Sequence, residues 1–199
     1  MSNNNGAPQQ SPNSAPQAAE SKDPESIIAT DSRSYFNTPT PTPDCRPLIR
    51  WIFTNPENAH DLANIAVVAG YECFRGNPLW LIRAQFQNDL LPGQLSIERN
   101  LATVPWGGKE NRVHYIEVCC AHPDYIRWIQ SSDGCLPPNA VIAGYMSDGD
   151  TLYVGRVYHE GSLIPGKLQA SQKKLYVSYQ GKEITFNQYE VMCQNVCNS

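Results

Sequence analysis

The sequence lacks clusters of basic residues and long hydrophobic runs. Its 15 lysines and arginines stand against 19 aspartates and glutamates, for a net charge of -4, and they form no stripe that could follow a phosphate backbone. Nucleic acid is therefore not an expected partner. No apolar stretch is long enough to span a bilayer, and residues 1–30 have neither the basic start nor the apolar run of a secretory signal. We therefore expect a cytoplasmic protein.

The chain also lacks the residue patterns of metal, cofactor and catalytic sites. Its seven cysteines include no Cys-x-x-Cys pair, and the chain has no His-x-x-x-His pair, so the ligand pairs of a structural zinc site are missing. It contains neither a glycine-rich loop between a strand and a helix nor a recognisable pairing of a nucleophile with a base. We predict a non-catalytic protein with no cofactor and no metal, whose cysteines are reduced, buried thiols.

The N-terminal part of the chain has few large apolar residues. Residues 1–44 contain seven prolines and cannot bury enough surface to offset the entropy lost on ordering, so we predict a disordered tail. The Thr-Pro-Thr-Pro-Thr-Pro run at 38–43 favours extended, polyproline-like geometry. Such a tail suits an adaptable arm for protein partners.

What the sequence does contain is a repeat. Residues 49–52 and 126–129 are both Ile-Arg-Trp-Ile, and four further blocks follow in the same order in both copies. These blocks are 66–71 with 140–145, 90–95 with 163–168, 108–110 with 181–183, and 117–120 with 190–193. We predict a first repeat at 45–120 and a second at 121–199. Because one copy alone buries too little surface, we expect the two to form one globular domain.

Turn residues and short apolar segments indicate strands. The Ser-Asp-Gly-Asp segment at 147–150 favours a tight hairpin, because glycine accepts a positive φ. The Pro-Gly pairs at 92–93 and 165–166 have the order that a type II turn requires. Helical character is confined to a turn within 58–68. We predict an all-β fold, an antiparallel β-sandwich or pseudo-barrel built from two pseudo-twofold-related repeats.

The motifs of the second copy resemble those of a known family. They are Asn-Ala-Val-Ile-Ala-Gly-Tyr at 139–145, Asp-Gly-Asp at 148–150, Leu-Tyr-Val-Gly-Arg at 152–156, Ile-Pro-Gly-Lys at 164–167 and Gly-Lys-Glu at 181–183. Residues 126–193 closely resemble the DM-nine repeat, and residues 49–120 are similar to a divergent copy of it. The resemblance implies a β-sandwich, and it implies that the chain is similar to mannose-binding lectins and cytosolic factors of innate recognition.

The resemblance also implies a sugar site. In lectin members, an acidic residue after the Gly-Tyr pair and the lysine of the Pro-Gly-Lys segment hold the sugar, because a carboxylate accepts hydrogen bonds from hydroxyls and an ammonium donates them. The first repeat has the acid, Glu72, but Gln94 in place of the lysine. The second has Lys167 but Met146 in place of the acid. Our hypothesis is that Glu72 and Lys167 complete one site across the pseudo-twofold axis, while Met146 and Gln94 form an inactive one.

The predicted function is therefore non-catalytic recognition of mannose-type carbohydrate, in innate immune recognition as the resemblance implies. The alternative is a cytosolic protein-interaction scaffold that has lost sugar binding. Expected partners are glycans and, through the tail, other proteins. The sequence leaves open whether the chain forms a homodimer.

Overall fold

The computed structural model describes residues 48–73 and 76–195. The chain divides into two units, Met1–Asp44 and Cys45–Ser199, and all described residues belong to the second. The disorder and polyproline geometry predicted for residues 1–44 lie outside the described residues.

The described residues form a nearly all-β structure in which each repeat supplies seven strands. The first repeat contains β1 (Ile49–Thr54), β2 (Val68–Tyr71), β3 (Pro78–Phe86), β4 (Asp89–Ser96), β5 (Leu101–Trp106), β6 (Lys109–Val113) and β7 (Ile116–Ala121). The second contains β8 (Ile126–Ser132), β9 (Ile142–Tyr145), β10 (Thr151–His159), β11 (Ser162–Gln169), β12 (Lys174–Tyr179), β13 (Lys182–Phe186) and β14 (Gln188–Gln194). Three short 3-10 helices lie at Ala59–Leu62, Ile97–Arg99 and Pro123–Tyr125.

Antiparallel pairing closes eight of these strands into a barrel. The order is β3-β2-β11-β12-β13-β6-β5-β4, and pairing of β4 with β3 completes the ring. Strands β9 and β10 bridge β4 and β11, while β7 with β1 and β14 with β8 extend the sheet beyond β3 and β10. The predicted antiparallel pseudo-barrel is confirmed.

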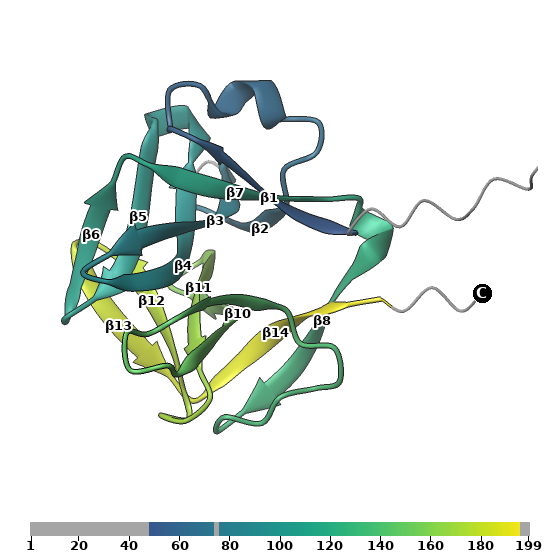
Figure 1. The fold of residues 1–199 in the computed structure, drawn as a ribbon, viewed down its shortest axis with the longest axis vertical. Coiled ribbons are helices and arrows are strands. Elements are labelled where there is room, and N and C mark those ends of the chain that lie inside the picture. The colour runs from purple at the N-terminus through teal and green to yellow at the C-terminus, as the bar shows by residue number, and fades with distance from the viewer. Residues whose placement is uncertain (1–47, 74–75, 196–199) are drawn as a thin grey trace, which may run out of the picture. The chain divides into compact units, whose positions relative to one another are not determined.

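The two repeats are related by a pseudo-twofold axis. Strand β3 begins at residue 78 and β10 at 151, a difference of 73 that holds for the next three strand pairs. Strands β6 and β13, each the equivalent of the other, pair antiparallel with Lys109 opposite Lys182, as a twofold axis requires. Figure 1 shows these two strands side by side where the blue-teal first repeat meets the green-yellow second.

Burial explains why the repeats fold together. One hydrophobic cluster lies mainly in the first repeat, one lies in the second, and a third draws on both. The third cluster packs equivalent residues into one interior, with Val67 and Val141, Ala69 and Ala143, Cys119 and Met192. Neither repeat could bury this surface alone.

Two local predictions are confirmed. The helical character expected within 58–68 is the 3-10 helix Ala59–Leu62. The 147–150 hairpin joins β9 to β10, with Gly149 at φ +91° and the Met146 amide donating to Asp150 O at 2.8 Å.

The turn prediction for the two Pro-Gly pairs is wrong, because Pro92-Gly93 and Pro165-Gly166 lie inside β4 and β11. One edge of β4 changes its neighbour at this point: Leu90 pairs with β9, whereas β5 pairs from Gln94 onward. Proline has no N–H to donate and is therefore tolerated where a strand edge changes partner.

The glycines of these pairs are needed for close backbone approach rather than for a positive φ. A Cβ on Gly93 would lie 2.2 Å from Thr103 O, and one on Gly166 would lie 2.2 Å from Tyr176 O. In each repeat, the fourth and fifth strands thus cross at a distance that only glycine permits.

Candidate functional site

A groove of about 310 Å³, here called the Glu72 groove, opens between the repeats. Its walls are formed by Glu72, Cys73, Leu79, Gln94, Arg99 and Leu101 together with Glu110, Ser162, Ile164, Ser178, Tyr179 and Gln180. The last five of these come from the second repeat. Both repeats therefore contribute side chains to one surface, most of them polar.

Glu72 is held at the edge of β2 by contacts on both its backbone and its side chain. Its amide donates to Asn77 O at 2.9 Å, which closes the loop before β3. Its carboxylate accepts from Arg99, whose Nε also donates to Ser96 Oγ at 3.3 Å. The Glu72 side chain is 20% exposed and that of Arg99 is 59% exposed, so the ion pair is accessible to a ligand in the groove.

Contacts across the pseudo-twofold axis fix other parts of the wall. Gln94 Nε2 donates to Ser178 O at 3.2 Å, and Glu110 Oε2 accepts from the Gly181 amide at 2.7 Å. Within the second repeat, the Tyr179 hydroxyl donates to Glu160 Oε2 at 3.0 Å. The wall is therefore made of side chains that are already oriented.

Lys167 is not in this groove. It is 3% exposed, and its Nζ donates to Pro105 O at 3.1 Å and to Glu183 Oε1 at 3.3 Å. Burial lowers the pKa of Lys167, and the Glu183 carboxylate opposes that shift. The side chain is thus engaged in the contact between the repeats.

Of the four predicted residues, the structure brings Glu72 and Gln94 together in the Glu72 groove and places Met146 and Lys167 outside its walls. Glu72 shares its groove with Gln94, because β2, β3 and β4 are neighbours in the sheet and carry both residues to one side. Met146 packs, half-buried, against the core cluster of the first repeat. The hypothesis that Glu72 and Lys167 meet in one groove is therefore not the arrangement found.

Sequence reasoning missed Arg99, Glu110, Ser178, Tyr179 and Gln180 as wall residues. One signal was available for Glu110, since its Gly-Lys-Glu block recurs at 181–183 and ends each time in a carboxylate. The carboxylate of each block accepts a backbone N–H from the opposite repeat: Glu110 from Gly181 and Glu183 from Gly108, both at 2.7 Å.

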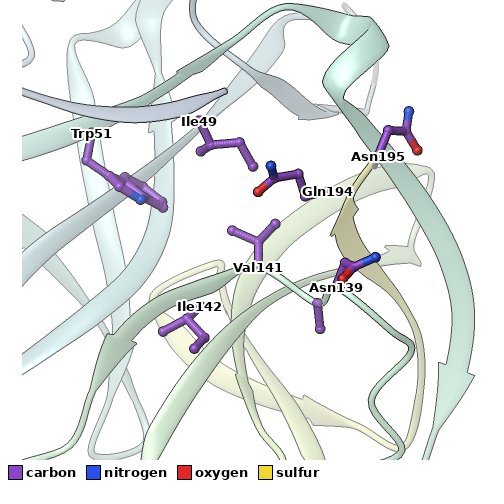
Figure 2. Close-up of a pocket in the computed structure, with 8 residues that line it drawn as sticks. Ile49, Trp51, Asn139, Val141, Ile142, Gln194 and Asn195 are labelled. Atoms are coloured by element: carbon purple, nitrogen blue, oxygen red, sulfur yellow. The ribbon is translucent and has the colours of Figure 1, made fainter. Parts of the chain in front are cut away.

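A second groove, of about 420 Å³, lies beside the edge strand β1. Figure 2 shows Ile49 and Trp51 of the first repeat and Val141 and Ile142 of the second around the same space. A smaller hollow of about 180 Å³, which includes the equivalent positions Val67, Val68 and Ile126, lies at the twofold-related place. The surfaces of this pair are largely apolar.

The structure also describes the surroundings of the cysteines and of the other groups that could bind a metal. Burial raises the pKa of the Cys119, Cys120 and Cys193 thiols, which disfavours the reactive thiolate. Within residues 48–73 and 76–195, no three His, Cys, Asp or Glu side chains gather as metal ligands would. In the same part of the chain, no helix has the length and apolar character needed to cross a membrane.

Comparison with known proteins gives a family and a fold. The family described as DM9 repeat matches residues 74–186 and 147–198. The crystal structure of the nematode sperm cell motility protein MFP2B is similar at a TM-score of 0.58 and 12% identity, covering 76% of this chain and 47% of that one. This chain thus spans about half the length of that protein, and the likeness shows a shared fold. No curated protein sequence matches this chain.

Proposed function

Because the chain belongs to the DM9 repeat family, we propose that it is a non-catalytic protein that recognises mannose-type carbohydrate, in the cytoplasm and in innate immune recognition. The ligand binds in the Glu72 groove. Glu72 accepts hydrogen bonds from sugar hydroxyls, and Gln94 lies beside it in the position where other family members carry lysine.

The observation that supports this proposal is the mixed polarity of the groove at a suitable size. Sugar hydroxyls both donate and accept, so a monosaccharide site needs acceptors and donors around a few hundred Å³. Glu72 and Glu110 supply carboxylate acceptors, while Arg99 supplies guanidinium donors at the rim. The Glu72–Arg99 pair holds both groups in place before the ligand arrives, which limits the entropy lost on binding.

Binding of mannose and a mannan oligosaccharide, followed by NMR titration of the full chain, tests the proposal. Glu72→Gln should weaken binding by about tenfold or more, because charged acceptors form the stronger hydrogen bonds. Glu98→Gln is the matched control, since Glu98 is exposed one residue before Arg99 and does not line the groove. Absence of binding by the unaltered chain, or equal affinities for the two variants, would contradict the proposal.

The second candidate is a protein-interaction scaffold that has lost sugar binding, and the observation that favours it is the Thr-Pro run at 38–43. Deletion of residues 1–44 separates the two functions. A scaffold that works through the tail loses its partners in a pull-down, whereas sugar binding in the Glu72 groove survives the deletion.

A further inference from the structure

The pseudo-twofold axis allows one half of the molecule to be compared with the other at the place where Lys167 is buried. In the second repeat, the Lys167 ammonium is surrounded by Pro105 O, Glu183 Oε1 and the ring of Tyr176, whose centroid lies 4.8 Å from Nζ. A carbonyl, a carboxylate and an aromatic face are typical partners of a buried cation.

The twofold-related place keeps a carbonyl, that of Ser178 in the second repeat, and the carboxylate of Glu110 in the first, but it lacks the cation. Gln94 occupies the position of Lys167 and donates to Ser178 O at 3.2 Å, as Lys167 donates to Pro105 O at 3.1 Å. Glu110 occupies the position of Glu183, and its Oε2 is held by a backbone amide in the same way. Within the described residues, no hydrogen bond or ion pair reaches Glu110 Oε1.

Unpartnered polar atoms gather at the same place. In the described part of the chain, three buried side-chain atoms have no hydrogen-bond partner: Gln94 Oε1, Thr103 Oγ1 and Ser178 Oγ. Thr103 pairs in register with Gln94, and the carbonyl of Ser178 accepts from Gln94. Thr103 and Ser178 are 2% and 1% exposed. Buried polar atoms without partners are rare and costly, so their concentration here indicates a ligand that donates hydrogen bonds.

The chemistry of these groups selects the donor. Gln94 Oε1 and Glu110 Oε1 can only accept, and the two hydroxyls accept as well as donate. Within the described residues, the half-buried Glu110 carboxylate has no ion-pair partner, whereas Glu183 has Lys167. A primary ammonium presents three N–H donors and one positive charge, and the equivalent position of the other half is filled by such a group. A neutral hydroxyl would supply one donor and no charge.

We infer that the Glu72 groove has an ammonium subsite, formed by Gln94, Glu110 and Ser178 where the twofold-related half carries Lys167, and that it prefers hexosamines to neutral hexoses. This inference rests on the proposed sugar binding in the same groove. The amine of the ligand takes the place of the missing lysine, while Glu72 and Arg99 contact the sugar hydroxyls at the rim.

NMR titration of the full chain with mannose, mannosamine, N-acetylmannosamine and n-butylamine tests the subsite. We expect mannosamine to bind about tenfold or more tightly than mannose, and the acetylated sugar to lose that advantage, because an amide nitrogen carries no charge. Equal affinities for mannose and mannosamine would overturn the inference and leave the proposed function intact. If butylamine binds but none of the three sugars does, the subsite is supported and sugar recognition is refuted. If none of the four compounds binds, both proposals are refuted.

Two variants locate the subsite. Gln94→Lys supplies from the chain itself the ammonium that Lys167 supplies in the other half, and it should abolish the preference for mannosamine. Glu110→Gln removes the charge while its amide oxygen can still accept from Gly181, and it should reduce the preference to near unity. Glu98→Gln should keep it. Retention of the preference in either groove variant, with folding verified by the melting temperature, would place the amine elsewhere and overturn the inference.

Discussion

Lys167 and Glu183 form a buried ion pair, with Nζ 3.3 Å from Oε1 and side chains only 4% and 9% exposed. The pair lies in the contact between the repeats, because Lys167 also reaches Pro105 O and Glu183 also accepts the Gly108 amide of the first repeat. The charged groups of the second repeat thus stabilise its attachment to the first. This explains how a lysine expected to bind a ligand is engaged inside the fold.

Lys167→Gln tests that role. The variant leaves the Glu183 carboxylate buried without its cation, so we expect the free energy of unfolding in urea to fall by about 3 kcal/mol. Lys174→Gln is the control, because Lys174 is exposed and its loss should change stability by less than about 0.5 kcal/mol. Similar unfolding curves for the two variants would show that the ion pair contributes little.

Gly93→Ala tests the crossing of β4 and β5. The new Cβ would lie 2.2 Å from Thr103 O and 2.8 Å from Val104 Cγ1, so backbone must move, and we expect a loss of about 3 kcal/mol or more, or failure to fold. At Gly149 an added Cβ meets nothing within 4 Å, although φ is +91°. Gly149→Ala should therefore cost only about 1 kcal/mol, as a strained turn residue does. Circular dichroism and urea unfolding measure both, and an equal cost at the two positions would refute the packing argument.

The fold class could be predicted from the sequence because the duplicated blocks are still recognisable in both repeats. Blocks such as 49–52 and 126–129 fixed the correspondence between the halves, and short β-branched segments between turns indicated strands. The type II turn predicted at Pro92-Gly93 was wrong because a Pro-Gly dipeptide occurs in two structural settings. In a turn, the dipeptide sets the φ angles. Here proline lies where β4 changes its neighbour from β9 to β5, and glycine leaves room for the Thr103 carbonyl of β5.

The candidate site was only partly predictable for a related reason. The family resemblance pointed to Glu72 and gave Gln94 as a degenerate position, but the spatial grouping of these two residues depends on which strands are neighbours. Glu110 and Ser178 reach the groove through contacts across the axis, between residues 71 and 84 positions apart. No local pattern encodes a contact of that kind, since it arises only when the barrel closes.

Asp150 gives the stability a predictable dependence on pH. Its carboxylate accepts from Ser171 Oγ and, at 2.7 Å, from Gln169 Nε2, and these hydrogen bonds, Ser171 first, hold its pKa below the usual 3.8. A carboxyl whose pKa is lower in the folded chain than in the unfolded chain binds a proton more readily when unfolded. The contribution of Asp150 to the free energy of unfolding is therefore present above about pH 3.8 and is lost as the pH falls through the lower pKa of the folded chain.

We expect Asp150→Asn to lower the free energy of unfolding by about 1 kcal/mol at pH 7, a modest amount because the group is partly exposed. The difference from the unaltered chain should shrink steadily below pH 4. Urea unfolding at pH 7, 5, 4 and 3 measures it, and Ser171→Ala should cost stability in the unaltered chain but little in the Asp150→Asn background. A difference that persists unchanged to pH 3 would show that Asp150 acts through packing rather than through its charge.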